Sequence, residues 1–233
     1  VTLFSLALPI FFESVLRTLM NTVNTMVLSR YSETAAGAIG TASTILMFMM
    51  MLFSMISTGV TVIIQQNLGA GNRKRAGEAA TISVVFCFLI SLLIGIVGSI
   101  YSREIMIWMN LEGELLDEAT KYFSIVSAFN FTQTMITVFA AITRSYGKTK
   151  INFIVALLMN ALNAVLNWVV VFRPFETPFF GIEGVAQTRI IAEGIALLVN
   201  VILVMRERIE FAWRSLLKPK FDLVWEIVKY GVP

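Results

Sequence analysis

Two ionised side chains lie inside the first long apolar segment of this sequence, where charge is unfavourable. Glu13 and Arg17 are four residues apart, so on a helix they share one face, with the acid first, the better order for an ion pair. Asn21 and Asn24 continue that broad face. A charge at the centre of a bilayer costs at least about 2.5–3.5 kcal/mol on insertion scales. Two interpretations stay open: an ion pair that locks this helix to its neighbours, or a cavity site for a substrate or coupling ion.

Asparagines form a second polar set, in the apolar segment 151–172. Asn163 and Asn167 are one helical turn apart. An asparagine surrounded by lipid either bridges helices by hydrogen bonds or offers its carbonyl oxygen to a cation. Without further information the bridging role is favoured.

The last apolar segment repeats the paired-charge arrangement. Arg189 and Glu193 are four residues apart, here with the arginine first. The same two interpretations apply, and the structural one is slightly favoured because the pair lies in the first third of the segment 185–205.

Little in the sequence points to catalysis or to a bound metal. There is no histidine and one cysteine, which excludes histidine relays and multi-cysteine metal sites and leaves proton chemistry to carboxylates. Cys87 stands among apolar residues and is expected to be buried. No phosphate-binding loop, dinucleotide glycine pattern or nucleophile–base–acid set is visible, and 69–72 is expected to be a turn at a helix end. We therefore expect neither an enzyme nor a cofactor.

The composition indicates that lipid solvates much of the chain. Hydrophobic residues make up 57% and charged residues 14% of the 233, and the mean hydropathy is +0.80. Soluble chains carry about a quarter charged residues, so this charge is too sparse to cover a soluble surface.

Six stretches are long and apolar enough to cross a bilayer, which needs about 20 residues. They are helices rather than barrel strands, because 46–56 is continuously apolar instead of alternating. Pro9 removes a backbone hydrogen bond and bends the first helix. The sequence predicts an all-α polytopic membrane protein, a six-transmembrane-helix bundle, with spans at roughly 3–28, 36–65, 81–101, 121–143, 151–172 and 185–205.

Basic residues are unevenly distributed between the expected loops. One set of loops holds Arg73, Lys74, Arg75, Arg144, Lys148, Lys150, Arg206, Arg208, Arg214, Lys218 and Lys220; the other holds Arg30, Arg103, Lys121 and Arg173. The positive-inside rule places the richer set, and with it the N-terminus, in the cytoplasm of a cell-membrane protein. These bases are interpreted as topology and lipid contacts, not as a nucleic-acid surface.

The end of the sequence resembles its beginning. Residues 225–233 can be laid on 1–9, each a short lead-in that ends in a proline. Since 1–9 opens a six-span unit, we expect a six-helix lobe at 1–205, a basic cytoplasmic linker at 206–221, and at 222–233 the truncated start of a second lobe. Repeat-built bundles are common in secondary transporters, so the chain is interpreted as a piece of a longer protein.

Five segments of the sequence point to the same family: LALP at 6–9, QQNLGAGNRKRAGEA at 65–79, TRSYGKTK at 143–150, NAVLNWVVVF at 163–172 and GIEGVAQT at 181–188. Together they resemble the N-terminal half of the multidrug and toxic compound extrusion (MATE) family.

The resemblance implies one lobe of a two-lobe (6+6) carrier whose second six-helix lobe is missing here. It implies an ion-coupled antiporter that exports small amphipathic or cationic organic compounds by alternating access, with Na⁺ or H⁺ as counter-ion. Pro9 matches the proline at which the first helix bends in many members of the family.

The sequence departs from the family where an ion is expected. Asn24 and Asn167 stand where the family often has aspartates, and the alignment puts Arg189 at a frequent threonine position. A unit charge about 4 Å from a cation contributes about 4 kcal/mol at an effective dielectric constant near 20, so these changes oppose a conventional sodium site. Either Arg189 is a built-in cation and coupling runs through the other lobe, which is favoured, or Glu13 is the protonatable group.

Two rival functions remain at this stage. A lipid-linked oligosaccharide flippase of the same wider superfamily would suit a more cationic cavity, and a non-transporting membrane scaffold would have its buried charges in closed pairs and no cavity. The methionines of 47–55 are interpreted as lipid-facing packing material rather than as a flexible drug surface.

Overall fold

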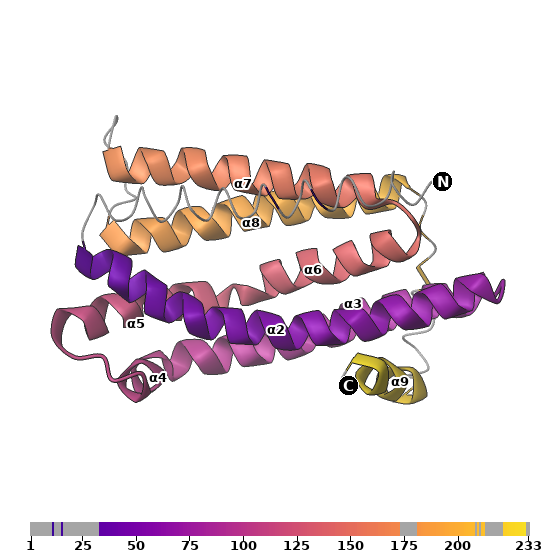
Figure 1. The fold of residues 1–233 in the computed structure, drawn as a ribbon, viewed down its shortest axis with the longest axis horizontal. Helices are drawn as coiled ribbons and strands as arrows, with labels where there is room; N and C mark the ends of the chain where they lie inside the picture. The colour runs from indigo at the N-terminus through magenta and orange to yellow at the C-terminus, as the bar shows by residue number, and fades with distance from the viewer. Residues whose placement is uncertain are drawn as a thin grey trace.

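The computed structural model describes Phe11, Val15 and residues 33–172, 181–207, 209, 211–212 and 221–231. Every regular element in these ranges is a helix, and the long helices lie side by side along one direction (Figure 1). The helices are α2 (Glu33–Gly69), α3 (Arg73–Ile100), α4 (Ser102–Trp108), α5 (Gly113–Ala128), α6 (Asn130–Ser145), α7 (Thr149–Phe172), α8 (Gly181–Arg206) and α9 (Phe221–Gly231).

One end of the bundle holds the α2–α3 turn, the α6–α7 turn and the end of α8 (Figure 1). We call it the basic end because it carries Arg73, Lys74, Arg75, Lys148 and Arg206. At the α2–α3 turn Gly71 adopts a φ of 75°, open to glycine at little steric cost. The side chain of Asn72 accepts a hydrogen bond from the backbone N–H of Arg75 and so caps α3. The expected turn at 69–72 is confirmed.

Membrane-spanning character is clear for most of the described helices. Four of them are long and apolar enough to cross a bilayer, at Thr34–Gly69, Arg73–Ile100, Thr149–Val170 and Gly181–Arg206. Large apolar side chains such as Leu198 of α8 are exposed on their outer faces, as lipid contact requires. The first expected span, at 3–28, lies outside the described residues except for Phe11 and Val15.

The span expected at 121–143 is not one straight helix. It consists of α5 and α6, which meet at Phe129 with a bend of 47°. Beside the break, the hydroxyl of Thr132 donates to the carbonyl oxygen of Phe129 at 2.8 Å, and such local side-chain bonds compete with helical ones. The expected span at 121–143 thus corresponds to a bent pair of helices, and counting this pair as one span gives five in the described part of the chain.

Helices α3 and α5 approach closely through small residues. A side chain added at Gly95 would lie 2.5 Å from the carbonyl oxygen of Ser127, and the Ser127 hydroxyl donates to the carbonyl oxygen of Gly95 at 3.2 Å. Small residues permit such backbone contacts between membrane helices. This contact fixes the first half of the bent span against α3.

The segment after α8 returns to pack on the basic end of the bundle. The backbone N–H of Ala212 donates to the hydroxyl of Thr81 in α3 at 2.9 Å, and the ring of Phe211 packs edge-on against Phe139 of α6. Helix α9 then lies across α2 and α3 (Figure 1) and buries its own Leu223 and Ile227. The assignment of 206–221 to a linker and 222–233 to a second lobe stays a prediction.

Candidate transport site

The structure places only part of the site expected from the sequence. Pro9, Glu13, Arg17, Asn21 and Asn24 lie outside the described residues. Asn163, Asn167, Arg189 and Glu193 are described, and all four lie in the interior between α5, α6, α7 and α8 or at its margin.

The two asparagines form a hydrogen-bonded chain that crosses from α7 to α8. The amide nitrogen of Asn167 donates to the side-chain oxygen of Asn163 at 2.7 Å. The amide oxygen of Asn167 accepts from the hydroxyl of Thr188 at 3.1 Å. Asn167 and Thr188 are both buried, so these contacts join the two helices in the interior, in the bridging role that was favoured for the asparagines.

Arg189 and Glu193 form a closed ion pair on α8. The Nε of Arg189 donates to Oε1 of Glu193 at 2.9 Å, one helical turn away. Its Nη1 donates to the hydroxyl of Tyr122 in α5 at 3.1 Å. The other carboxylate oxygen of Glu193 accepts from the hydroxyl of Thr132 in α6 at 2.9 Å. The pair therefore connects α8 to both sides of the break at Phe129.

These contacts join into one polar seam, by which we mean Tyr122, Thr132, Asn163, Asn167, Thr188, Arg189 and Glu193. The seam has two hydrogen-bonded parts that meet at consecutive residues of α8. Thr188 binds Asn167 of α7, and Arg189 binds Tyr122 of α5. The resemblance suggested that Arg189 replaces a threonine, and in the structure the hydroxyl that donates to Asn167 belongs to the neighbouring Thr188. Tyr122 and Thr132 carry no charge, and no pattern singled them out; Thr188 entered the sequence analysis only as the last residue of GIEGVAQT.

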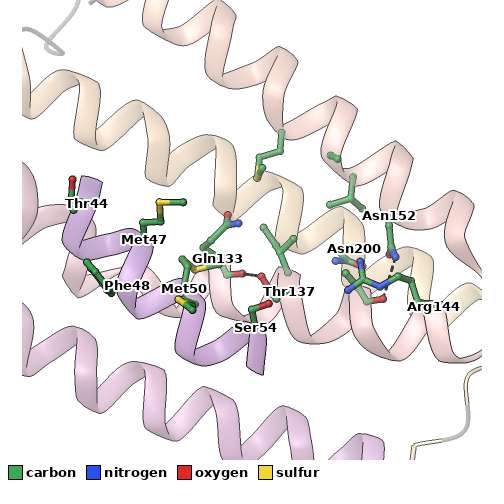
Figure 2. Close-up of a pocket in the computed structure, with 16 residues that line it drawn as sticks. Thr44, Met47, Phe48, Met50, Ser54, Gln133, Thr137, Arg144, Asn152 and Asn200 are labelled. Carbon is green, nitrogen blue, oxygen red and sulfur yellow. Dashed lines mark hydrogen bonds between the residues drawn. The ribbon is translucent and has the colours of Figure 1, made fainter. Parts of the chain in front are cut away.

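A separate cavity of about 770 Å³ opens beside the seam. We call it the lateral groove. It is lined by α2, α6, α7 and one residue of α8 (Figure 2). The lining residues are Thr44, Met47, Phe48, Met50, Met51, Ser54, Gln133, Ile136, Thr137, Ala140, Arg144, Asn152, Val155, Ala156, Met159 and Asn200.

The two ends of the lateral groove differ in chemistry. Figure 2 shows Arg144, Asn152 and Asn200 gathered at one end, and Met47 and Phe48 at the other. The side-chain oxygen of Asn152 accepts a hydrogen bond from the hydroxyl of Thr143 at 2.6 Å, and its amide nitrogen donates to the carbonyl oxygen of Ala140. Asn200 is 1% exposed, and its side-chain oxygen makes no hydrogen bond within the described part of the chain. The groove thus has a cluster of hydrogen-bonding groups at one end, while along the rest the methionines and Phe48 alternate with single polar side chains such as Gln133 and Thr137.

None of the described seam residues lines the groove. Sequence reasoning had assigned Arg144 to topology and the methionines to packing. Met47 and Met51 are indeed largely exposed, but they also border the groove. The spacing of 133, 137, 140 and 144 on one face of α6 is the signal that could have found it.

Comparison with known proteins decides the family. Residues 9–169 match the family model described as MatE. The chain belongs to the MATE family. This family's members are membrane transporters, and the apolar helices described above fit that assignment.

Two MATE relatives cover the chain from end to end. It is 35% identical over 233 residues to the "Uncharacterized transporter YisQ" of Bacillus subtilis, covering 51% of that protein. It is 31% identical over 234 residues to the "Probable multidrug resistance protein NorM" of Thermotoga maritima, covering 50% of it. The chain spans about half the length of these relatives and corresponds to the N-terminal lobe of a MATE transporter.

Solved structures of MATE proteins share this fold. One, described as the outward-facing conformation of a multidrug resistance MATE family transporter of the MOP superfamily, matches with a TM-score of 0.89 at 20% identity. The match covers 98% of this chain and 50% of the other. A transporter from Pyrococcus furiosus, described by the reverse polarity of its binding pocket, matches equally well.

Proposed function

We propose that the protein containing this chain is a secondary active transporter, an ion-coupled antiporter that exports amphipathic organic compounds by alternating access. Its site of action is the cell membrane, with the basic end in the cytoplasm, as the positive-inside rule favours. The counter-ion is Na⁺ or H⁺. Family membership supports transport, and the relatives named as probable multidrug resistance proteins support the class of compound.

The lateral groove is the observation that carries this proposal. Its volume of about 770 Å³ lies within the range of small-molecule sites, roughly 300–1,000 Å³. Methionines and Phe48 provide an adaptable apolar wall, and Gln133, Asn152 and Asn200 supply hydrogen-bonding groups. Such a lining suits compounds with a flat or flexible apolar body and one polar end.

The test is transport by the full-length protein in proteoliposomes loaded with a fluorescent amphiphile, under an imposed Na⁺ or H⁺ gradient. Thr137→Phe fills the groove from α6 and is expected to reduce gradient-driven transport at least about tenfold, since it removes binding of the transported molecule. Leu198→Phe is the matched control, because Leu198 is 66% exposed on α8 and does not line the groove. Equal transport by both variants, or no gradient-dependent movement of any compound by the unmodified protein, would count against the proposal.

One feature favours a second candidate, a lipid-linked oligosaccharide flippase. Arg144 lines the polar end of the groove, and no carboxylate lines it among the described residues. A guanidinium binds phosphate well, so this end suits an anionic head group better than a cationic drug. Competition by a long-chain prenyl diphosphate for the fluorescent amphiphile, lost in Arg144→Gln but kept in Arg144→Lys, would favour the flippase.

A further inference from the structure

The guanidinium of Arg189 donates to oxygen atoms from two helices, and a third helix binds its carboxylate partner. Glu193 on α8 and Tyr122 on α5 accept from it at 2.9 and 3.1 Å. Thr132 on α6 completes the set by donating to the same carboxylate at 2.9 Å. Tyr122, Thr132 and Glu193 are each no more than 5% exposed. The partners are therefore buried, while the Arg189 side chain itself keeps 24% of its surface exposed, so protein atoms surround most of the ion pair.

A carboxylate with two hydroxyl groups is a donor set that also suits a small hard cation. Buried ions need a partner of opposite charge, because desolvation of an isolated charge costs several kcal/mol. Here the partner is a side chain of the protein itself, Arg189, which lies one helical turn from Glu193 on the same helix. The set is electrically neutral as it stands, and a second cation would have to displace the guanidinium.

We infer that Arg189 is a tethered cation that permanently fills a cation-binding position formed by Tyr122, Thr132 and Glu193. This lobe then does not take up the counter-ion at that position, and the coupling ion of the transport cycle binds elsewhere in the protein. The statement about the coupling ion rests on the proposed antiport. Whether Arg189 fills a cation-binding position can be tested without measuring transport.

Removing the tethered charge should open the position. In Arg189→Met the side-chain volume is nearly kept while the charge and donors are lost, so the Glu193 carboxylate is left buried without a partner. Na⁺ or a proton can then take the place of the guanidinium, and anything that binds the folded state raises its stability.

The experiment is thermal unfolding of the purified full-length protein, measured against NaCl with choline chloride at matched ionic strength, and against pH. Arg189→Met is expected to unfold at lower temperature than the unmodified protein and to gain a Na⁺- or acid-dependent rise of about 5 °C. Arg189→Met combined with Glu193→Gln should lose that added response. Arg206→Met is the control, because Arg206 is exposed at the far end of the same helix. A folded Arg189→Met protein with no added response to Na⁺ or acid would overturn the inference.

A second variant tests the position without disturbing its charges. Tyr122→Phe removes one oxygen from the set and keeps the ion pair. If Arg189 fills the position, the Na⁺ or H⁺ dependence of transport in Tyr122→Phe should stay within about twofold of the unmodified protein. A large loss of ion dependence in this variant would mean that the counter-ion already binds there. Failure of the proposed antiport itself gives a different result, namely no ion-dependent transport by the unmodified protein.

Discussion

Gly59 of α2 lies directly against the backbone carbonyl of Ile227 in α9, with no space for a side chain between them. The contact is matched on the other helix, where a side chain added at Gly231 would lie 2.6 Å from the carbonyl oxygen of Met55. The two helices therefore meet backbone to backbone, a close approach that glycine permits.

Gly59→Ala is expected to separate α9 from α2, because an added methyl group would meet backbone rather than a movable side chain. Overpacking of this kind costs about 1–3 kcal/mol. Hydrogen exchange of the α9 amides should accelerate, and the melting temperature of the full-length protein should fall. Gly40→Ala is the matched control in the same helix, since nothing lies within 4 Å of its added methyl group. Comparable exchange of α9 in the two variants would show that the contact does not hold this helix in place.

The ion pair between Arg75 and Glu226 is expected to add little to the docking of α9. The two side chains are 3.2 Å apart but 47% and 37% exposed, and exposed pairs contribute about 0.2–1 kcal/mol. A double-mutant cycle with Arg75→Ala and Glu226→Ala, read out as α9 hydrogen exchange, should give a coupling energy in that range that falls at high salt. A coupling above about 2 kcal/mol would contradict the expectation that solvent screens this pair.

Thr188→Val is expected to weaken the α7–α8 contact while keeping the shape of the side chain. The variant removes the hydroxyl that donates to the oxygen of Asn167, and interhelical hydrogen bonds of this kind contribute about 0.6 kcal/mol on average and up to about 1.7. Thr188→Ser keeps the hydroxyl and should unfold close to the unmodified protein. The measurement is the melting temperature of both variants. A larger loss in Thr188→Ser than in Thr188→Val would assign the role of Thr188 to its methyl group instead.

Replacing one member of the pair Arg189–Glu193 is expected to destabilise the protein more than replacing both. Glu193→Leu leaves the guanidinium unpaired, and breaking a buried pair costs about 3–5 kcal/mol. The double variant with Arg189→Met and Glu193→Leu leaves no unpaired charge and should recover much of that loss. Chemical or thermal unfolding of the three proteins provides the comparison. A double variant less stable than Glu193→Leu would show that the polar contacts to Tyr122 and Thr132 contribute more than the ion pair.

The fold could be predicted from the sequence because membrane spans are recognised by hydrophobicity averaged over many residues. Apolar stretches of about 20 residues define spans whatever their neighbours do, and the described helices match the expected spans at 36–65, 81–101, 151–172 and 185–205. The break at Phe129 escaped notice because neither glycine nor proline marks it. The structure shows a local side-chain hydrogen bond there instead, from the hydroxyl of Thr132 to the carbonyl oxygen of Phe129.

The site was harder to predict, because its geometry depends on which helices meet. Spacing alone placed Arg189 and Glu193 on one face, and the structure pairs them. Spacing did not reveal Tyr122 or Thr132, which reach the pair from other helices. The idea that these charged side chains mark a path for the transported molecule stays a prediction, and the groove beside the pair is lined largely by side chains that looked unremarkable in sequence.

The packing of Ala212 and α9 on the bundle has a practical consequence for measuring motion. Trp225 projects from α9 and is 70% exposed, while the backbone beneath it is fixed to α2 and α3. A spectroscopic label on that residue would therefore move as part of the α2–α3 unit. Distances from such a label to a reference point elsewhere in the transporter would record displacement of this whole bundle, with little contribution from bending of the connecting chain.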